Sequence, residues 1–176
     1  MIQQAVRLLP AVVAIIAGIT DWRSRRIPNW LTVPALLIGI ATNSWLHGWA
    51  GAKTSLLGAG LGLLLLLPFV LIRSLGAGDW KLVGALGAFL GPQQLLTVLF
   101  ATLIVAGVMA LVLVIWKGRF LRTLRNMGRM VAAFGSFHLP GRELTLDDPQ
   151  AAKVPFGVAV AVAMVFYTVG EILGRA

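Results

Sequence analysis

The chain has 176 residues, of which 59% are hydrophobic and only 12% are charged. A water-soluble domain of this length needs far more polar surface, so the composition excludes one and indicates a polytopic membrane protein. The net charge is +9, but the basic residues are confined to short segments between apolar runs, which argues against nucleic-acid binding.

Apolar runs that could cross a bilayer recur along the whole chain. Since a membrane-spanning helix needs about 20 apolar residues, we predict an all-α membrane bundle of about six transmembrane helices. Residues 1–176 should form one integral-membrane domain. The first and the fourth spans are short, which is typical of broken or tilted helices that line a cavity. The predicted spans are Ala5–Thr20, Trp30–Trp49, Ser55–Ile72, Trp80–Leu90, Gln94–Trp116 and Pro155–Leu173.

The basic residues fall mostly on one side of these spans. Arg23, Arg25 and Arg26 follow the first span, and a longer basic segment follows the fifth. Because Lys and Arg are enriched in cytoplasmic loops, we predict that the amino terminus lies outside and that these segments face the anionic inner leaflet. The first apolar run has its basic cluster behind it and no small-residue cleavage site, so we interpret it as a retained span.

The segment 117–154 is the longest between two predicted spans. Arg119, Arg122, Arg125 and Arg129 recur there at steps of three and four residues, with apolar residues between them. This spacing predicts a cytoplasmic amphipathic helix that lies on the membrane surface and leads into a polar loop. We interpret the helix as an anchor on anionic lipid.

Two acidic residues lie at the ends of predicted spans. Asp21 ends the first span and Asp79 begins the fourth, so both should lie at the cytoplasmic boundary. If the two helices are neighbours, the carboxyl groups can share a proton and activate one water molecule. Each residue also has a structural alternative. Asp21 could pair with Arg25 or Arg26, and Asp79 could be the N-cap of a helix that starts at Trp80.

Three short motifs bear on this choice, and each resembles an element of the prepilin peptidase (type IV leader peptidase) family. The first resembles the D-x(5)-IPN motif, the second the GxGDxKL form of the GxGD signature of intramembrane aspartyl proteases, and the third the K-x-PFG element. They occur in the family's order and span nearly the whole chain. In this sequence they read Asp21-Trp22-Arg23-Ser24-Arg25-Arg26-Ile27-Pro28-Asn29, Gly76-Ala77-Gly78-Asp79-Trp80-Lys81-Leu82 and Lys153-Val154-Pro155-Phe156-Gly157.

The resemblance implies that Asp21 and Asp79 are the catalytic pair. Glycines before Asp79 let the backbone bend and leave room for an extended peptide, while Asn29 could cap a helix beginning at Trp30. For the proline, asparagine and glycine residues of the first and third motifs, a structural role is favoured over direct chemistry. The residues predicted to shape the site or bind substrate are Gly76, Gly78, Lys81, Pro28, Asn29, Pro155, Phe156 and Gly157.

The resemblance also implies a substrate and a location. The family cleaves precursors of type IV pilins, Flp-type pilins or secretion pseudopilins where a polar leader meets an apolar helix, and it is a multi-pass family of the bacterial cytoplasmic (inner) membrane. One aspartate would deprotonate water while the other protonates the carbonyl oxygen. Helix dipoles and Lys81 favour Asp79 as the ionised base and Asp21 as the protonated acid.

Cysteine is absent, and with it the paired CxxC motifs of larger family members, which also methylate the product with S-adenosylmethionine. The chain therefore resembles the short, peptidase-only branch found with Flp-type pili, and we expect no cofactor and no metal. Two other classes stay open on the residues alone. The acids could serve a small proton- or cation-coupled transporter, or the chain could be a non-catalytic subunit of an assembly machine.

Overall fold

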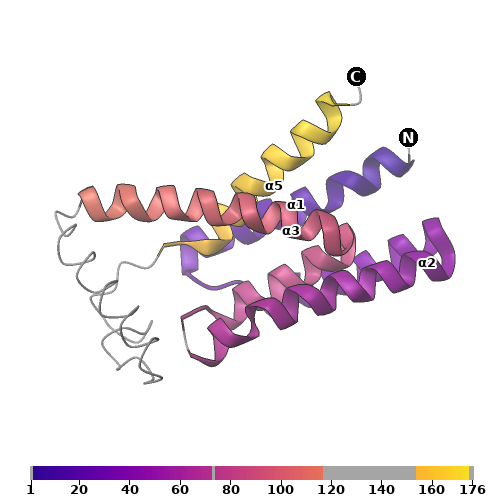
Figure 1. The fold of residues 1–176 in the computed structure, drawn as a ribbon, viewed down its shortest axis with the longest axis horizontal. Helices are drawn as coiled ribbons and strands as arrows, with labels where there is room; N and C mark the ends of the chain where they lie inside the picture. The colour runs from indigo at the N-terminus through magenta and orange to yellow at the C-terminus, as the bar shows by residue number, and fades with distance from the viewer. Residues whose placement is uncertain (1, 73, 117–153, 175–176) are drawn as a thin grey trace.

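A computed structural model of the protein describes residues 2–72, 74–116 and 154–174. Within these ranges the chain forms four α-helices and no strand (Figure 1). Three of them, α2, α3 and α5, are long and apolar enough to cross a membrane. The all-α membrane class is therefore confirmed. The helices are α1 (Ile2–Ser24), α2 (Asn29–Leu71), α3 (Ala77–Trp116) and α5 (Phe156–Leu173).

The helix α2 is a hairpin with two limbs. Gly48 has φ 60° and ψ −142°, a left-handed conformation that glycine adopts without steric cost. Asn43 donates a hydrogen bond to the Ser55 hydroxyl at 3.0 Å although the two residues are 12 positions apart. In a straight helix that separation would be about 18 Å. The chain therefore turns back at Gly48, which lies at the end of the molecule where Figure 1 shows the bend of α2.

The helix α3 turns back in the same way at Gly91, which has φ 75° and ψ 176°. Val83 and Leu95 lie on opposite sides of this residue, yet both lie against Gly62 of α2, where a Cβ atom would be 3.0 Å and 3.1 Å from them. Pro92 follows the kink and has no N–H to donate to the carbonyl four residues earlier. The α3 hairpin thus exposes a backbone acceptor at its bend.

Two side chains of α2 satisfy that acceptor. Ser55 donates to the Ala88 carbonyl at 2.6 Å, and the Asn43 amide donates to the Ala88 and Phe89 carbonyls at 2.9 Å and 3.0 Å. Ser55 is completely buried. A backbone carbonyl left unpaired in an apolar environment costs several kcal/mol. The Asn43–Ser55 pair therefore stabilises the bend of α3 from the neighbouring helix.

Because of the two bends, the described part of the chain has fewer separate helices than the sequence predicted. The sequence predicted about six, whereas the described residues contain four, because the chain reverses at Gly48 and Gly91 with hardly any loop. One glycine at each bend carries the non-helical dihedrals, and helical hydrogen bonding resumes directly on either side. The predicted amphipathic helix and loop of 117–154 lie outside the described residues except for Val154. The orientation of the chain and the single-domain organisation stay predictions.

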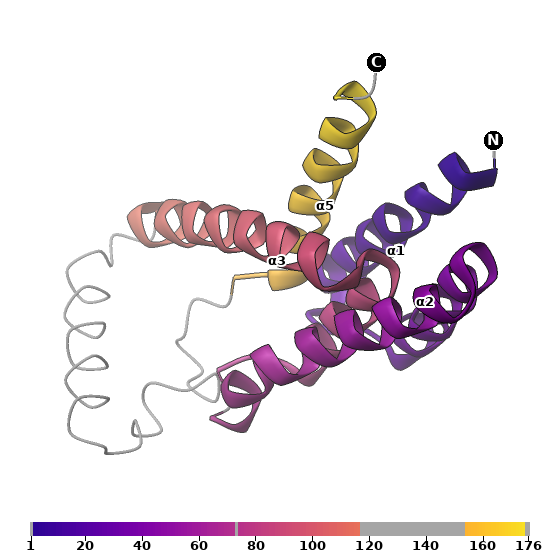
Figure 2. The same ribbon diagram turned by 45° about the vertical axis from the view of Figure 1, so that its right-hand side comes forward.

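The helices pack in two pairs that meet at α3. The helix α2 packs mainly on α3, α1 packs mainly on α5, and α5 also contacts α3, as Figure 2 shows. Small residues allow this close approach, as where the backbones of Gly58 and Gly87 meet. Leu82, Leu86 and Leu95 lie fully buried in the core between them.

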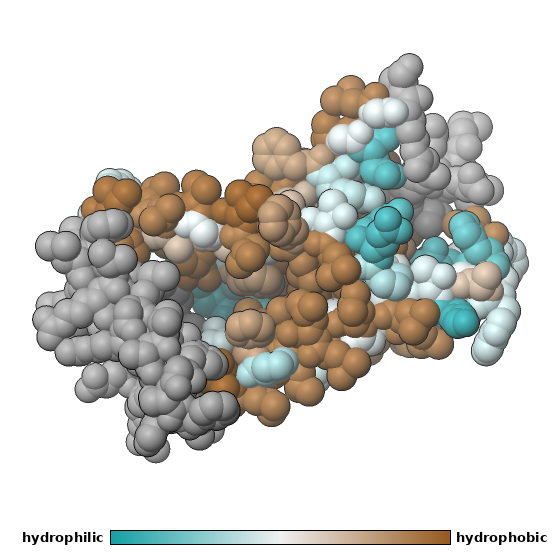
Figure 3. Space-filling model, viewed as in Figure 1, coloured by the Kyte–Doolittle hydropathy of each residue, from teal (hydrophilic) through white to brown (hydrophobic). Residues whose placement is uncertain are grey.

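The outer surface is apolar along much of its length. Figure 3 shows hydrophobic residues over the middle of one face, and large side chains such as Leu64, Phe100 and Leu103 point outward. Exposed apolar area of this extent is unfavourable in water and fits a lipid environment.

Candidate active site

Asp21 lies in the last turn of α1 and is buried, with 7% of its surface exposed. Its Oδ2 accepts a hydrogen bond from the Gly157 N–H at 2.9 Å. Gly157 is the second residue of α5, and the first N–H groups of a helix have no partner within it. The carboxyl group of Asp21 therefore caps α5 from a position 136 residues earlier in the chain.

This contact weakens the argument by which Asp21 was predicted to be the protonated acid and Asp79 the ionised base. Asp21 was expected to be the protonated acid because it lies at the carboxyl end of α1, where the helix dipole disfavours negative charge. The structure places the amino end of α5 against the same carboxyl group, and that dipole favours negative charge. The two effects oppose each other, so the assignment of acid and base stays a prediction.

Asp79 is the third residue of α3 and is half-buried. Its carboxyl group lies beside Gly76, just before the helix. An acidic side chain at the third helical position is placed to reach back toward the N-cap, as in a capping box. The predicted alternative, an N-cap for a helix that starts at Trp80, is wrong because α3 already begins at Ala77.

The glycine before the helix gives this carboxyl group its space. A Cβ atom on Gly76 would lie only 2.9 Å from the Asp79 Oδ2. A side chain at position 76 would therefore displace the carboxyl group. The site-shaping role of Gly76 stays a prediction.

The two aspartates lie at the same end of the bundle. Ile27, in the connection between α1 and α2, lies between the starts of α3 and α5. A Cβ atom on Gly157 would be 3.2 Å from the Ile27 Cδ1, and one on Gly78 would be 3.0 Å from the Ile27 carbonyl oxygen. The charge of Asp21 acts on the carboxyl group of Asp79. Residues remote in sequence thus place two acids within electrostatic reach.

Lys81 and Asn29 connect the first turns of two helices. The Lys81 ammonium group donates a hydrogen bond to the Asn29 Oδ1 at 3.0 Å, in an exposed position. The predicted capping role of Asn29 is wrong, since Asn29 is the first residue of α2 and no side chain caps that helix. Pro28 is the N-cap instead, with an extended backbone, and its carbonyl accepts the N–H of Leu31 at 3.2 Å.

The third motif forms the start of α5. Pro155 is the N-cap, with φ −70° and ψ 96°, and its carbonyl accepts the Val158 N–H at 3.2 Å. Phe156 is partly buried against the hydrophobic core. Pro155 and Phe156 therefore position the helix start, while Gly157 contacts Asp21 directly.

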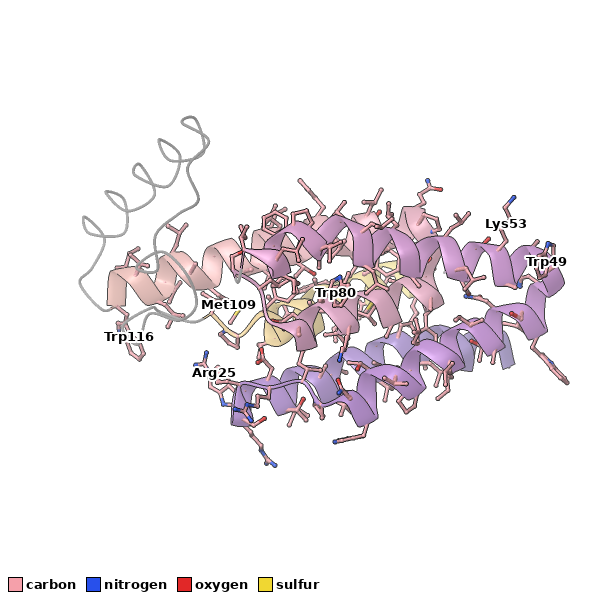
Figure 4. All side chains as sticks on the ribbon, turned by 90° about the horizontal axis from the view of Figure 1, so that it is seen from below. Arg25, Trp49, Lys53, Trp80, Met109 and Trp116 are labelled. Carbon is pink, nitrogen blue, oxygen red and sulfur yellow. The ribbon has the colours of Figure 1, made fainter. Side chains whose placement is uncertain are left out.

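Arg25 is one of the two residues with which Asp21 was predicted to pair if its role were purely structural. Its N–H donates to the Asp21 carbonyl at 2.9 Å and its φ of 52° ends the helical conformation. Its charge also acts favourably on the Asp21 carboxylate. Figure 4 places Arg25 at one end of the molecule and Trp49 and Lys53 at the other. Arg25 therefore lies at the same end of the molecule as the candidate site, where its charge can act on Asp21.

Two residues at this end were not singled out from the sequence. Ile27 lies between the glycines at the starts of α3 and α5. The indole N–H of Trp80 donates to the Leu63 carbonyl at 2.7 Å and joins the first turn of α3 to α2 (Figure 4). Ile27 lies in the first motif and Trp80 in the second, but a position inside a motif does not predict which residue a side chain contacts.

Within the described ranges, His, Asp and Glu residues form no group of three or more that could hold a metal ion. The expectation of no metal and no cofactor stays a prediction. Fold and site together define the class of the protein: an all-helical membrane protein that gathers two acidic side chains at one end of its bundle.

Comparison with known proteins identifies the family. The sequence profile of the type IV leader peptidase family matches residues 8–111, a range that contains Asp21 and Asp79. The chain therefore belongs to this family of peptidases, as the three motifs indicated.

Similar curated proteins carry the name prepilin leader peptidase/N-methyltransferase. Those of Burkholderia pseudomallei strains 1026b and K96243 are 34% identical over 106 residues, which cover 56% of this chain and 34% of each relative. That of Xanthomonas campestris pv. campestris is 30% identical over 122 residues, which cover 65% of this chain and 42% of the relative. The chain thus spans less than half the length of these relatives. No solved structure matches it.

Proposed function

We propose that this protein is a membrane-embedded aspartyl endopeptidase that removes the leader peptide of type IV prepilins, Flp-type pilins or pseudopilins. The observation that carries the proposal is the placement of Asp21 and Asp79 at the same end of the bundle, where Ile27 contacts Gly157 beside Asp21 and Gly78 next to Asp79. Family membership and the names of the relatives supply the substrate class.

The chemistry follows from two carboxyl groups that hold one proton between them. The ionised group takes a proton from water as the water oxygen attacks the scissile carbonyl carbon, and the protonated group gives its proton to the carbonyl oxygen. The tetrahedral intermediate collapses when the carboxyl group that took the water proton gives it to the amide nitrogen, the other carboxylate takes a hydroxyl proton back, and the C–N bond breaks. The carboxyl group of Asp21 already accepts one backbone N–H. A carboxylate has two oxygens, so acceptor capacity for water or substrate remains.

The proposed topology is multi-pass, with six crossings of the bacterial inner membrane and the amino terminus outside. The bends at Gly48 and Gly91 support it because each divides a long helix into two antiparallel limbs. Both limbs of α2 and the second limb of α3 have about 20 residues or more and are thus about 30 Å long or longer, which matches the hydrocarbon core, whereas the first limb of α3, residues 77–90, is shorter. Arg23, Arg25 and Arg26 lie just after Asp21, which supports a site at the cytoplasmic boundary under the positive-inside rule. The anionic inner leaflet would be its lipid partner.

We further propose that the protein cleaves without methylating its product and uses no S-adenosylmethionine or other cofactor. The absence of cysteine supports this, because the larger family members to which the sequence was likened carry paired CxxC motifs. Mass spectrometry of the cleaved product, made with S-adenosylmethionine present, would test it. An added methyl group on the new amino terminus would contradict the proposal.

The experiment for the main proposal is cleavage of a purified prepilin by the purified chain in liposomes. Asp21→Asn and Asp79→Asn keep the size of the side chain but remove the acid, so each should lower the rate by at least about 10²-fold. The matched control is Glu171→Gln, which removes an acid near the end of α5, and it should keep the wild-type rate. Near wild-type activity in either aspartate variant would refute the proposal.

The same preparation separates the alternatives. Intact substrate together with proton or cation flux through the liposomes would favour the transporter. Normal pilus assembly in cells that carry either aspartate variant would favour the non-catalytic subunit. Both outcomes are incompatible with a peptidase that depends on Asp21 and Asp79.

A further inference from the structure

An open groove with a volume of about 510 Å³ runs between α1 and α5 on the outside of the bundle. Ile15, Ile19 and Trp22 form the wall on α1. They are spaced by four and three residues, so they lie on one face of that helix. The groove therefore follows the helix axis as a long apolar seam.

The opposite wall has the same spacing on α5, where Val158, Val162 and Val165 line the groove. Its floor is made of small residues. A Cβ atom on Gly18 would lie 2.8 Å from the Ala161 Cβ, so α1 and α5 touch at this point. Small residues between two apolar walls allow a third helix to approach closely, which is how helices associate in membranes.

One end of the groove adjoins the candidate site. Trp22 follows Asp21 in the chain, and Val158 follows Gly157, so one lining residue neighbours each partner of the 2.9 Å hydrogen bond. Arg23 is the one charged residue of the lining and lies at this end. The other lining residues are uncharged and lead away from the site along both helices. The groove thus changes from apolar to charged where α1 approaches its end.

We propose that this α1/α5 groove docks the apolar transmembrane helix of the prepilin substrate and brings the junction between leader and helix to Asp21. The inference rests on the proposed function, which supplies a substrate with an apolar helix directly after a polar leader. Such a substrate has the same polarity profile as the groove, apolar along its length and polar at the site end. A lipid chain or a second copy of the protein could fill the apolar part of the groove, but neither would bring a peptide bond to the end beside Asp21, and both are outcomes of the test below.

The first test is site-specific photo-crosslinking in membranes that contain the Asp79→Asn variant and an intact prepilin, so that bound substrate is not consumed. A photoreactive residue at Ile19 or Val162 should form adducts with the apolar helix of the prepilin. The matched control position is Val108 of α3, which is exposed to the surroundings on another helix. Equal yields from Val108, adducts only with lipid, or adducts only with a second copy would each overturn the proposal.

The second test fills the groove and measures kinetics. Val162→Trp should raise the KM for intact prepilin by roughly tenfold or more with kcat unchanged, because overfilling a packed contact costs enough for that factor. Val108→Trp should leave both constants unchanged. A short peptide that spans the junction without the apolar helix should be cleaved equally by wild type and Val162→Trp, which shows that the variant is folded.

The outcomes distinguish this inference from the proposed function. If wild type cleaves prepilin and neither Val162→Trp nor Ile19→Trp changes its KM, the groove is not the docking site and the peptidase proposal stands. If wild type cleaves no prepilin at all, the proposed function fails and the docking proposal fails with it.

Discussion

The two ends of the bundle both hold polar side chains among apolar helices, but they use them differently. At the end with the two bends, Asn43 and Ser55 donate to carbonyls that the Pro92 kink leaves without a helical partner. At the other end, Asp21 accepts the Gly157 N–H, and Asp79 lies at the start of α3 nearby. Polar groups that satisfy one another stabilise a membrane fold, whereas the two acids are the groups that we propose to carry the chemistry.

The largest effect, after loss of either aspartate, is expected from Gly157→Ala. The added Cβ atom would lie 2.9 Å from the Asp21 Cβ and 3.1 Å from its Oδ2, so the carboxyl group must move. Misplacement of a catalytic group by about 1 Å can cost about 10²-fold in rate, and we expect a loss of this order in prepilin cleavage.

The matched control is Gly170→Ala in the same helix, where a Cβ atom would meet nothing within 4 Å. It should keep the wild-type rate. If both variants were equally active, Gly157 would have no positioning role and the comparison between the two ends would lose its main support.

A smaller and different effect is expected at the bends. Ser55→Ala leaves the buried Ala88 carbonyl with one donor fewer and should lower the free energy of unfolding by about 1–2 kcal/mol. The rate of cleavage per folded molecule should stay unchanged, since Ser55 lies away from the two acids. Thermal unfolding in detergent, together with an activity assay at low temperature, separates stability from catalysis.

Thr42→Ala is the control for that experiment. The partly exposed Thr42 hydroxyl donates only to carbonyls of its own helix, those of Ile38 and Gly39, so its loss should be nearly neutral. A loss of activity in Ser55→Ala that exceeds its loss of folded protein would show that the far end also affects the chemistry.

The smallest effect is expected from the exposed Lys81–Asn29 hydrogen bond. A double-mutant cycle with Lys81→Met and Asn29→Ala should give a coupling of about 0.5–1.5 kcal/mol in kcat/KM. That range corresponds to a moderate positioning role between the starts of α2 and α3. Strictly additive effects of the two substitutions would show that the hydrogen bond does not position the site.

The motifs predicted the candidate site better than the contacts within it. Asp21, Asp79 and Gly157 could be named from the sequence because their neighbours resemble family motifs. The hydrogen bond that joins Asp21 to Gly157 could not, because it links residues 136 positions apart. The local capping expected of Asn29 was wrong because its side chain accepts a hydrogen bond from Lys81 instead, another contact between separate helices.

The bends show why the helix count could not be read from the pattern. Gly48 and Gly60 are both glycines in apolar surroundings, yet only Gly48 takes a positive φ. Polar residues follow both bends, Lys53 and Thr54 in α2 and Gln93 and Gln94 in α3, so hydropathy alone places a loop where the structure has a single glycine kink.

By itself, the sequence determined the membrane environment, the helical class and the family, because these depend on composition and on residues that are neighbours in the chain. The tertiary structure alone decided that Asp21 caps α5, that Ile27 lies between the starts of α3 and α5, and that Asn43 and Ser55 hold the bend of α3. Each of those contacts joins segments far apart in the chain, so it exists only once the helices have packed.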